Sequence, residues 1–138
     1  MNPPNFHLET TDLETAWIHE PVISNYFLKL NQGDFSAVAQ LFADQGCLCP
    51  PFQAEICGRQ AIYDYLLAEG QGMTAIPKSG SIELLQDGGT THQLAGQART
   101  ALFTVNVAWR IDLNPAKQIT SVTVKLLAEL PELLGFRR

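Results

Sequence analysis

A long alternating run from Phe103 to Leu113 most constrains the folds open to this chain. Its β-branched and aromatic residues alternate with polar or small ones, which is typical of a strand with one buried face. The run ends at Asn114-Pro115-Ala116-Lys117, where proline favours a turn and cannot donate to a strand ladder. Residues 118–127 then read as a second strand. The stretch therefore predicts an antiparallel hairpin.

Two further strands are expected before this hairpin. Residues 81–86 and 90–102 flank Asp87-Gly88-Gly89, a sequence that suits a hairpin turn. The first half of the chain is different, because apolar residues recur there at helical spacing within residues 21–30, 35–42 and 60–69. About three helices followed by a large antiparallel sheet predict the α+β class.

Local signals predict where the helices begin and end. Pro21 suits the first turn of a helix, Gly33 a left-handed cap at its end, and Asp34 the N-cap of the next helix. The segment Cys47–Phe52 contains Pro50-Pro51, which cannot sit inside a central ladder. We therefore expect that segment to be a short edge strand or a bend.

The domain organisation is simple. Residues 1–20 are expected to form a partly helical N-terminal extension, with a capping box from Thr11 to Glu14. Residues 21–138 are expected to form one domain that closes with a helical turn starting at Pro131. A chain of 138 residues is long enough to bury its own core, and we find no internal repeat or linker.

Composition and charge exclude several classes of protein. Apolar residues make up 46% and charged residues 17% of the chain, which indicates a globular protein. A net charge of −5 and the lack of a basic stripe argue against nucleic-acid binding. No apolar run reaches the ~18 residues of a membrane span. The first residues carry no basic and apolar leader, so we expect a cytoplasmic protein.

The three cysteines, Cys47, Cys49 and Cys57, are candidates for redox chemistry. An odd number in a reducing compartment argues against a disulfide framework. Ordinary buried cysteines are the favoured interpretation, with a redox role or an intersubunit disulfide as the alternative. A metal is least favoured, because a structural site normally needs four ligands in two close pairs and the histidines lack ligand spacing.

The order of helices and strands resembles the superfamily of nuclear transport factor 2 (NTF2) and ketosteroid isomerase. That resemblance implies a cone-shaped half-barrel, in which a curved antiparallel sheet carries the helices on its concave face. Asn31–Phe35, followed by Leu41-Phe42, resembles the start of that superfamily in general. More particular motifs are Pro50–Gln53, Gly58–Ile62, Gln71–Met73, Ile76-Pro77 with Gly80, Ala108–Arg110, Leu113–Pro115, Leu126–Ala128 and Pro131–Leu134. In their order and spacing, over roughly residues 21–138, they resemble the C-terminal domain of orange carotenoid proteins and its free-standing homologues.

This resemblance implies a protein that binds a ketocarotenoid for transfer, storage or photoprotective quenching. In the family, a tyrosine on the first helix and a tryptophan on the central sheet donate hydrogen bonds to the keto oxygen of the carotenoid. Tyr26 and Trp109 match these two positions. Both side chains place a donor on a large apolar body, and a buried carbonyl without a partner costs ~1–3 kcal/mol.

Other apolar residues could line the same pocket, although an ordinary core role is the safer interpretation of Met73 and Ile76. The candidates beside Tyr26 and Trp109 are Phe52, Met73, Ile76, Phe103 and Leu127. The chain departs from the family before the central strand, where a tryptophan-containing segment is replaced by Thr-Ala-Leu-Phe-Thr at residues 100–104 and about four residues are missing. A second pocket tryptophan is thus absent, with Leu102 or Phe103 near its place.

An isomerase is one alternative. It would need a carboxylate base inside the cone, within hydrogen-bond reach of its substrate. The strand expected after the second helix has no acid, and Glu55 lies beyond the proline pair. Glu83 and Asp112 could face inward, but neither is a convincing base, and we expect no enzyme.

A protein-binding scaffold without a ligand is the other alternative. Alternate residues of the central strand, such as Val105, Val107 and Ile111, could form a second apolar face for a homodimer. A shift of one residue exchanges the two faces, so the sequence does not assign them. A homodimer is expected in either case, and for a carrier a carotenoid donor or acceptor protein as well.

Overall fold

The computed structural model describes residues 16–127 of the chain. The helical elements are η1 (Ala16–His19), α2 (Pro21–Gln32), α3 (Phe35–Gln40) and α4 (Arg59–Glu69). The strands are β1 (Phe42–Cys49), β2 (Ile56–Cys57), β3 (Thr74–Leu84), β4 (Thr90–Arg99), β5 (Thr104–Leu113) and β6 (Ile119–Leu127). The predicted capping box and the predicted helical turn after Pro131 lie outside the described residues.

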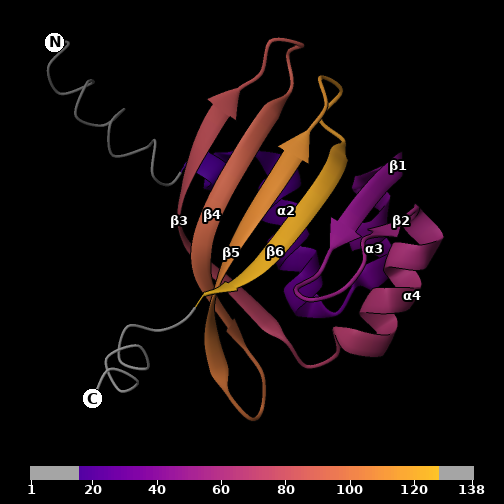
Figure 1. The fold of residues 1–138 in the computed structure, drawn as a ribbon, viewed down its shortest axis with the longest axis vertical. Coiled ribbons are helices and arrows are strands. Elements are labelled where there is room, and N and C mark those ends of the chain that lie inside the picture. The colour runs from indigo at the N-terminus through magenta and orange to yellow at the C-terminus, as the bar shows by residue number, and fades with distance from the viewer. Residues whose placement is uncertain (1–15, 128–138) are drawn as a thin grey trace, which may run out of the picture.

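All the strands belong to one curved sheet with the order β2-β1-β6-β5-β4-β3. Strands β3 to β6 form consecutive antiparallel pairs, as the sequence predicts. Strand β1, however, runs parallel to β6, so the expectation of a fully antiparallel sheet is wrong. The helices cover one face of the sheet and leave the other face open (Figure 1). The predicted α+β cone of the NTF2-like type is confirmed.

The ends of α2 and α3 follow the predicted local chemistry. Helix α2 begins at Pro21, and Gly33 caps it in the left-handed region with φ 77°. The Gly33 N–H donates to the Leu30 carbonyl at 3.1 Å. The Asp34 carboxylate accepts from the Ala37 N–H at 3.2 Å and caps α3. These short-range signals fix the turn between the two helices.

Strand β1 differs from its prediction in both length and position. The expected second helix already ends at Gln40, and the strand starts at Phe42 and stops at Cys49. Pro50 therefore lies just outside the ladder, which is where a residue without an N–H donor is tolerated. The edge position belongs to the short strand β2, so β1 is an interior strand.

Strand β5 shows which side chains face the helices. Val107, Trp109, Ile111 and Leu113 are buried, whereas Arg110 between them is exposed. The odd-numbered residues therefore form the inner face and the even-numbered ones the outer face. This assignment is the one that the sequence pattern alone leaves open.

Helix α2 is held across the inner face at two points. The Asn31 side chain donates to the Ala75 carbonyl at 2.8 Å and accepts from the Ala75 N–H at 2.7 Å. Phe27 packs edge-on against Trp109 with ring centroids 5.0 Å apart. These contacts fix the helix above the central strand and so position one wall of the site. None of the described helices is long and apolar enough to cross a membrane.

Candidate ligand-binding site

An apolar cavity of about 240 Å³ lies between the inner face of the sheet and helices α2 and α4. Strand β1 and the proline pair after it close one side. Most of its lining is aliphatic or aromatic, with few polar groups, as is common in small-molecule sites. The lining residues are Tyr26, Leu30, Leu48, Pro50, Pro51, Tyr65, Leu66, Glu69, Gly70, Met73, Ala75, Ala98, Thr100, Phe103, Val105, Val107, Trp109, Val124 and Leu126.

Tyr26 and Trp109 lie on two different walls of this cavity. Tyr26 belongs to α2 and Trp109 to β5, and their exposed fractions are 3% and 4%. Phe27 packs edge-on against both rings, with centroid distances of 5.1 Å to Tyr26 and 5.0 Å to Trp109. The sequence prediction that both residues line a pocket agrees with this geometry.

Both residues carry a hydrogen-bond donor that no described protein group uses. Among the described residues, the fully buried polar side-chain atoms without a partner are Trp17 Nε1 and His92 Nδ1. Among the described residues, none forms a hydrogen bond with the Tyr26 hydroxyl or the Trp109 N–H, and both residues line the cavity. Burial, reinforced by Tyr65, raises the pKa of Tyr26 well above its ordinary value. Its hydroxyl therefore keeps its proton and can donate at neutral pH.

The polar groups at the cavity include two residues of α4. The pKa of Tyr65 is raised, first by burial and also by the charge of Glu69, while a hydrogen bond with Gln53 acts in the opposite direction. Neither Tyr65 nor Glu69 is among the pocket residues that the sequence predicts. The carboxylate of Glu69 is exposed at the C-terminal end of α4.

The acids that the sequence offered as candidate bases lie away from the cavity. Asp112 faces the outer side of the sheet, where Thr91 and Ser121 donate to its carboxylate at 2.8 and 3.2 Å. Glu83 pairs with Thr91 on the neighbouring strand and is exposed. Among the described residues, Glu69 is the one acid in the cavity lining. This geometry gives the isomerase alternative no buried base.

Four of the predicted pocket residues meet at the cavity: Tyr26, Met73, Phe103 and Trp109. Ile76 and Leu127 do not line it. In each case the adjacent residue, Ala75 or Leu126, is the lining one. Neighbouring residues of a strand point to opposite faces, and the sequence prediction was one residue out of register.

Phe52 is also absent from the cavity lining. Its side chain is 92% exposed on the loop between β1 and β2, where its φ of 62° is unusual for a residue other than glycine. It lines a separate surface hollow of about 380 Å³ together with Cys49 and Lys125. Pro50 and Pro51, interpreted from the sequence only as a bend, line the cavity instead.

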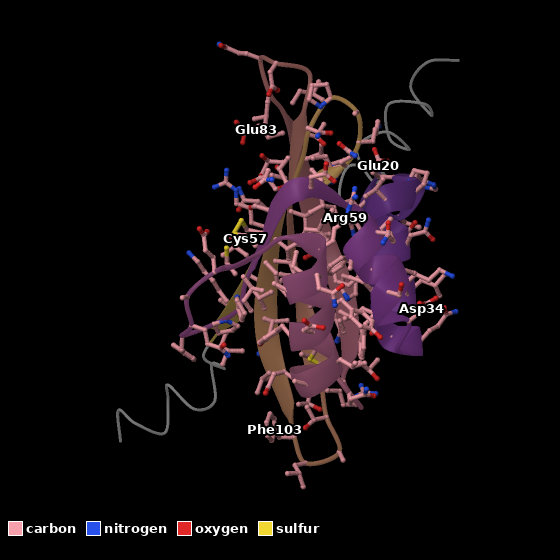
Figure 2. All side chains as sticks on the ribbon, turned by 90° about the vertical axis from the view of Figure 1, so that its right-hand side faces the viewer. Glu20, Asp34, Cys57, Arg59, Glu83 and Phe103 are labelled. Atoms are coloured by element: carbon pink, nitrogen blue, oxygen red, sulfur yellow. A yellow bond between two sulfur atoms is a disulfide. The ribbon has the colours of Figure 1, made fainter. Side chains whose placement is uncertain are left out.

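The short connection between β4 and β5 lies at one end of the cavity. Phe103 and Leu102 are 56% and 88% exposed there. The turn is tight, because the Thr100 N–H donates to the Phe103 carbonyl at 2.8 Å. Phe103 lines the cavity and lies near the lower end of the molecule in Figure 2, near the predicted place of the missing tryptophan.

The cysteines differ most from their prediction. Cys47 and Cys57 form a disulfide between β1 and β2, and Cys49 is free. An odd number of cysteines does not exclude a disulfide, because the pairing of two strands can bring two of the three together. Cys47 and Cys57 are directly opposite partners in the β1–β2 ladder. A yellow sulfur–sulfur bond marks this pair at the sheet edge in Figure 2.

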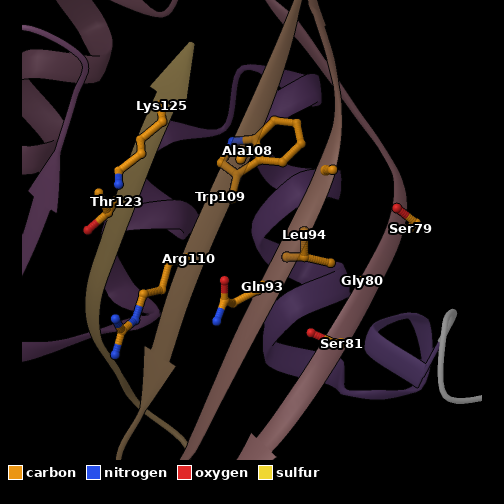
Figure 3. Close-up of a pocket in the computed structure, with 11 residues that line it drawn as sticks. Ser79, Gly80, Ser81, Gln93, Leu94, Ala108, Trp109, Arg110, Thr123 and Lys125 are labelled. Carbon is orange, nitrogen blue, oxygen red and sulfur yellow. The ribbon is translucent and has the colours of Figure 1, made fainter. Parts of the chain in front are cut away.

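The open face of the sheet carries a second, larger hollow of about 690 Å³. Its lining is mainly small or polar, as Figure 3 shows for Gln93, Arg110, Thr123 and Lys125. The exposed Arg110 lies 3.3 Å from Asp112 on the same strand. This surface therefore lacks the apolar character of the inner cavity.

The fold and its inner cavity define an NTF2-like domain. An NTF2-like protein with a cystatin-like fold from Novosphingobium aromaticivorans matches all of this chain and 97% of its own, with a TM-score of 0.63 and 17% identity. A neighbour at 23% identity and a TM-score of 0.60 is an epoxide hydrolase/cyclase-like enzyme. Likenesses at this level show the fold alone.

Two curated proteins are similar to this chain at higher sequence identity than these structural neighbours. The orange carotenoid-binding protein of Synechocystis sp. is 34% identical over 140 residues, covering 99% of this chain and 44% of that protein. The protein of the same name from Limnospira maxima is 33% identical over 137 residues, covering 96% and 43%. The Anabaena (Nostoc) sp. orange carotenoid protein, solved with canthaxanthin, matches 84% of this chain and 38% of its own, with 37% identity and a TM-score of 0.77.

The chain is therefore a homologue of the orange carotenoid protein C-terminal domain, as its motifs predict. It spans less than half the length of these relatives. No family model matches the chain.

Proposed function

We propose that this protein binds a ketocarotenoid, without bond-making chemistry, and serves in carotenoid transfer, storage or photoprotective quenching. The observation that carries the proposal is a pair of donors, on Tyr26 and Trp109, that lie on two walls of one apolar cavity and have no hydrogen-bond partner among the described residues. The name of the relatives and the canthaxanthin in one of them support the same ligand class.

The size of the cavity favours one end ring of such a ligand. At about 240 Å³ it is smaller than the ~300–1,000 Å³ of a typical drug-sized site. A long polyene would therefore place one ring inside and extend past Phe103 or the proline pair. Burial of the apolar ring drives binding at ~25 cal/mol per Å², and the two donors fix its keto oxygen.

The part of the polyene outside the cavity needs a second cover. We propose that a second copy of the chain supplies it in a homodimer, and that a donor or acceptor protein replaces that copy during transfer. The described part of the chain places no buried acid in the cavity, which supports a binding role over an isomerase. We place the protein in the cytoplasm, where cellular reductants would act on its disulfide.

The test is expression of the full chain in bacteria that make canthaxanthin, followed by the visible spectrum of the purified protein. We expect a coloured protein with a broad, red-shifted band. Ala98→Phe fills the cavity from β4 and should give a folded, colourless protein. Ala95→Phe, on the opposite face of the same strand, is the matched control and should stay coloured.

A colourless wild-type protein from cells with proven pigment would contradict the proposal. Equal colour in the Ala98→Phe and Ala95→Phe variants would show that the pigment lies outside the cavity. Circular dichroism of each variant distinguishes lost binding from lost folding.

A further inference from the structure

The three cysteines and one glutamate gather at the β1–β2 edge, away from the cavity. Cys47 Sγ, Cys57 Sγ and a carboxylate oxygen of Glu55 all lie within 4.8 Å of one another. Cys49 Sγ lies 3.9 Å from Glu55 Oε2. We propose that these four residues bind one zinc ion, or a similar thiol-seeking metal ion, when the disulfide is reduced.

The strand pairing brings these donors together from separate points of the chain. Cys47 and Cys49 are two residues apart on β1 and so share a face, while Leu48 between them lines the inner cavity. Cys57 faces Cys47 across the ladder, and the Gly58 N–H donates to the Gly46 carbonyl at 2.9 Å next to it. The backbone thus holds the site in place before any ion arrives.

The distances suit a small tetrahedral ion. Three atoms no more than 4.8 Å apart share a point within about 2.8 Å of each, whereas zinc needs ~2.3 Å to sulfur and ~2.0–2.2 Å to oxygen. These three side chains therefore need only small rotations, whereas Cys49, which reaches Glu55 but lies outside this close group, needs a larger one to become the fourth ligand. Glu55 and Cys57 are exposed and Cys47 is partly buried, which leaves a path for entry.

Three thiolates and one carboxylate make a donor set that zinc accepts. Cysteine and histidine spacing alone disfavours a metal, because it leaves Glu55 out of the donor set. The spacing Cys-x-Cys-x₅-Glu-x-Cys contains the complete set within eleven residues, from Cys47 to Cys57.

Reduction and metal binding are balanced steps. A dithiol reductant delivers two electrons and two protons to the Cys47–Cys57 bond and becomes a disulfide itself. The chain then holds three thiols, and zinc displaces their three protons as it binds. The ion would replace the disulfide as the link between β1 and β2. The proposal does not depend on carotenoid binding.

The test is a zinc titration of the full chain, metal-free and under argon, in competition with a chromophoric chelator. The reduced protein should bind one zinc ion per chain, and the disulfide form should bind none at the same concentration. Cobalt used as a substitute should give the intense visible bands of a tetrahedral thiolate site. Cys49→Ser and Glu55→Gln should each weaken zinc binding at least tenfold, whereas the exposed control Glu83→Gln should leave it unchanged.

Two results would overturn the proposal. One is reduced protein that binds no stoichiometric zinc. The other is wild-type affinity in both Cys49→Ser and Glu55→Gln, which would reveal only an ordinary pair of thiols. If reduction unfolds the chain, recovery of its circular dichroism on adding zinc supports the site, and failure to recover rejects it.

Discussion

Removal of one oxygen atom from Tyr26 tests the role of the cavity donors. In Tyr26→Phe the ring that packs against Phe27 stays, and only the hydroxyl is lost. No described group bonds to that hydroxyl, so the protein without ligand loses no hydrogen bond. We expect its free energy of unfolding in urea to change by less than about 0.5 kcal/mol.

The effect on the ligand should be larger. A hydrogen bond to a carbonyl contributes about 0.5–1.5 kcal/mol net, which corresponds to about a 2- to 13-fold loss of affinity. The assay is titration with canthaxanthin in detergent, followed by quenching of tryptophan fluorescence and by the visible band. Tyr63→Phe, on the same helix as Tyr65 but outside the cavity lining, is the control and should bind as the wild type does.

Two outcomes would refute this reasoning. Wild-type affinity and an unchanged band in Tyr26→Phe would show that the hydroxyl does not contact the ligand. A large loss of stability in the protein without ligand would show that the hydroxyl has a structural partner instead.

Three further predictions concern the fold. Asn31→Ala removes both hydrogen bonds to β3 and should lower the free energy of unfolding by about 2 kcal/mol in urea, while the neighbouring Gln32→Ala should change it little. Gly96→Ala would press its new methyl group against the backbone carbonyl of β3 and should cost about 1–3 kcal/mol in the same assay. Burial is the main cause that lowers the pKa of His92, so the unfolded chain takes up its proton first. Stability should therefore be complete above the unfolded pKa of about 6.5 and fall as the pH drops toward 5, and His92→Asn should flatten this dependence more than the exposed control His19→Asn.

Local chemistry made much of the first half predictable. Pro21, Gly33 and Asp34 mark helix ends through their own backbone preferences, which depend on no distant residue. The hairpin from β5 to β6 was similarly visible, because the turn around Pro115 separates two alternating runs. Each of these signals acts over a few residues.

Features that depend on distant pairing were not visible. The parallel contact between β1 and β6 joins segments about 75 residues apart, and no local pattern encodes it. Whether Cys47 and Cys57 lie opposite each other depends on the register of the two-residue strand β2. The sequence gives the cysteines but not this register.

Strand register also explains why some of the predicted pocket residues line the cavity and others do not. Tyr26 and Trp109 came from a resemblance that aligned each residue individually, and both line the cavity. Ile76 and Leu127 were chosen for their apolar character and face the other way. Apolar character alone does not assign a side of the sheet when both faces carry apolar residues.

The most direct test of the central claim compares canthaxanthin with β-carotene, which has the same polyene but lacks keto oxygens. The apolar burial is nearly the same for both, so the comparison isolates the hydrogen bonds from Tyr26 and Trp109. Two such bonds predict that canthaxanthin binds about 5- to 150-fold more tightly, from about 1–3 kcal/mol, and that this preference disappears when both residues are changed to phenylalanine. Equal affinity of the wild-type protein for the two pigments, or binding of neither, would contradict the account.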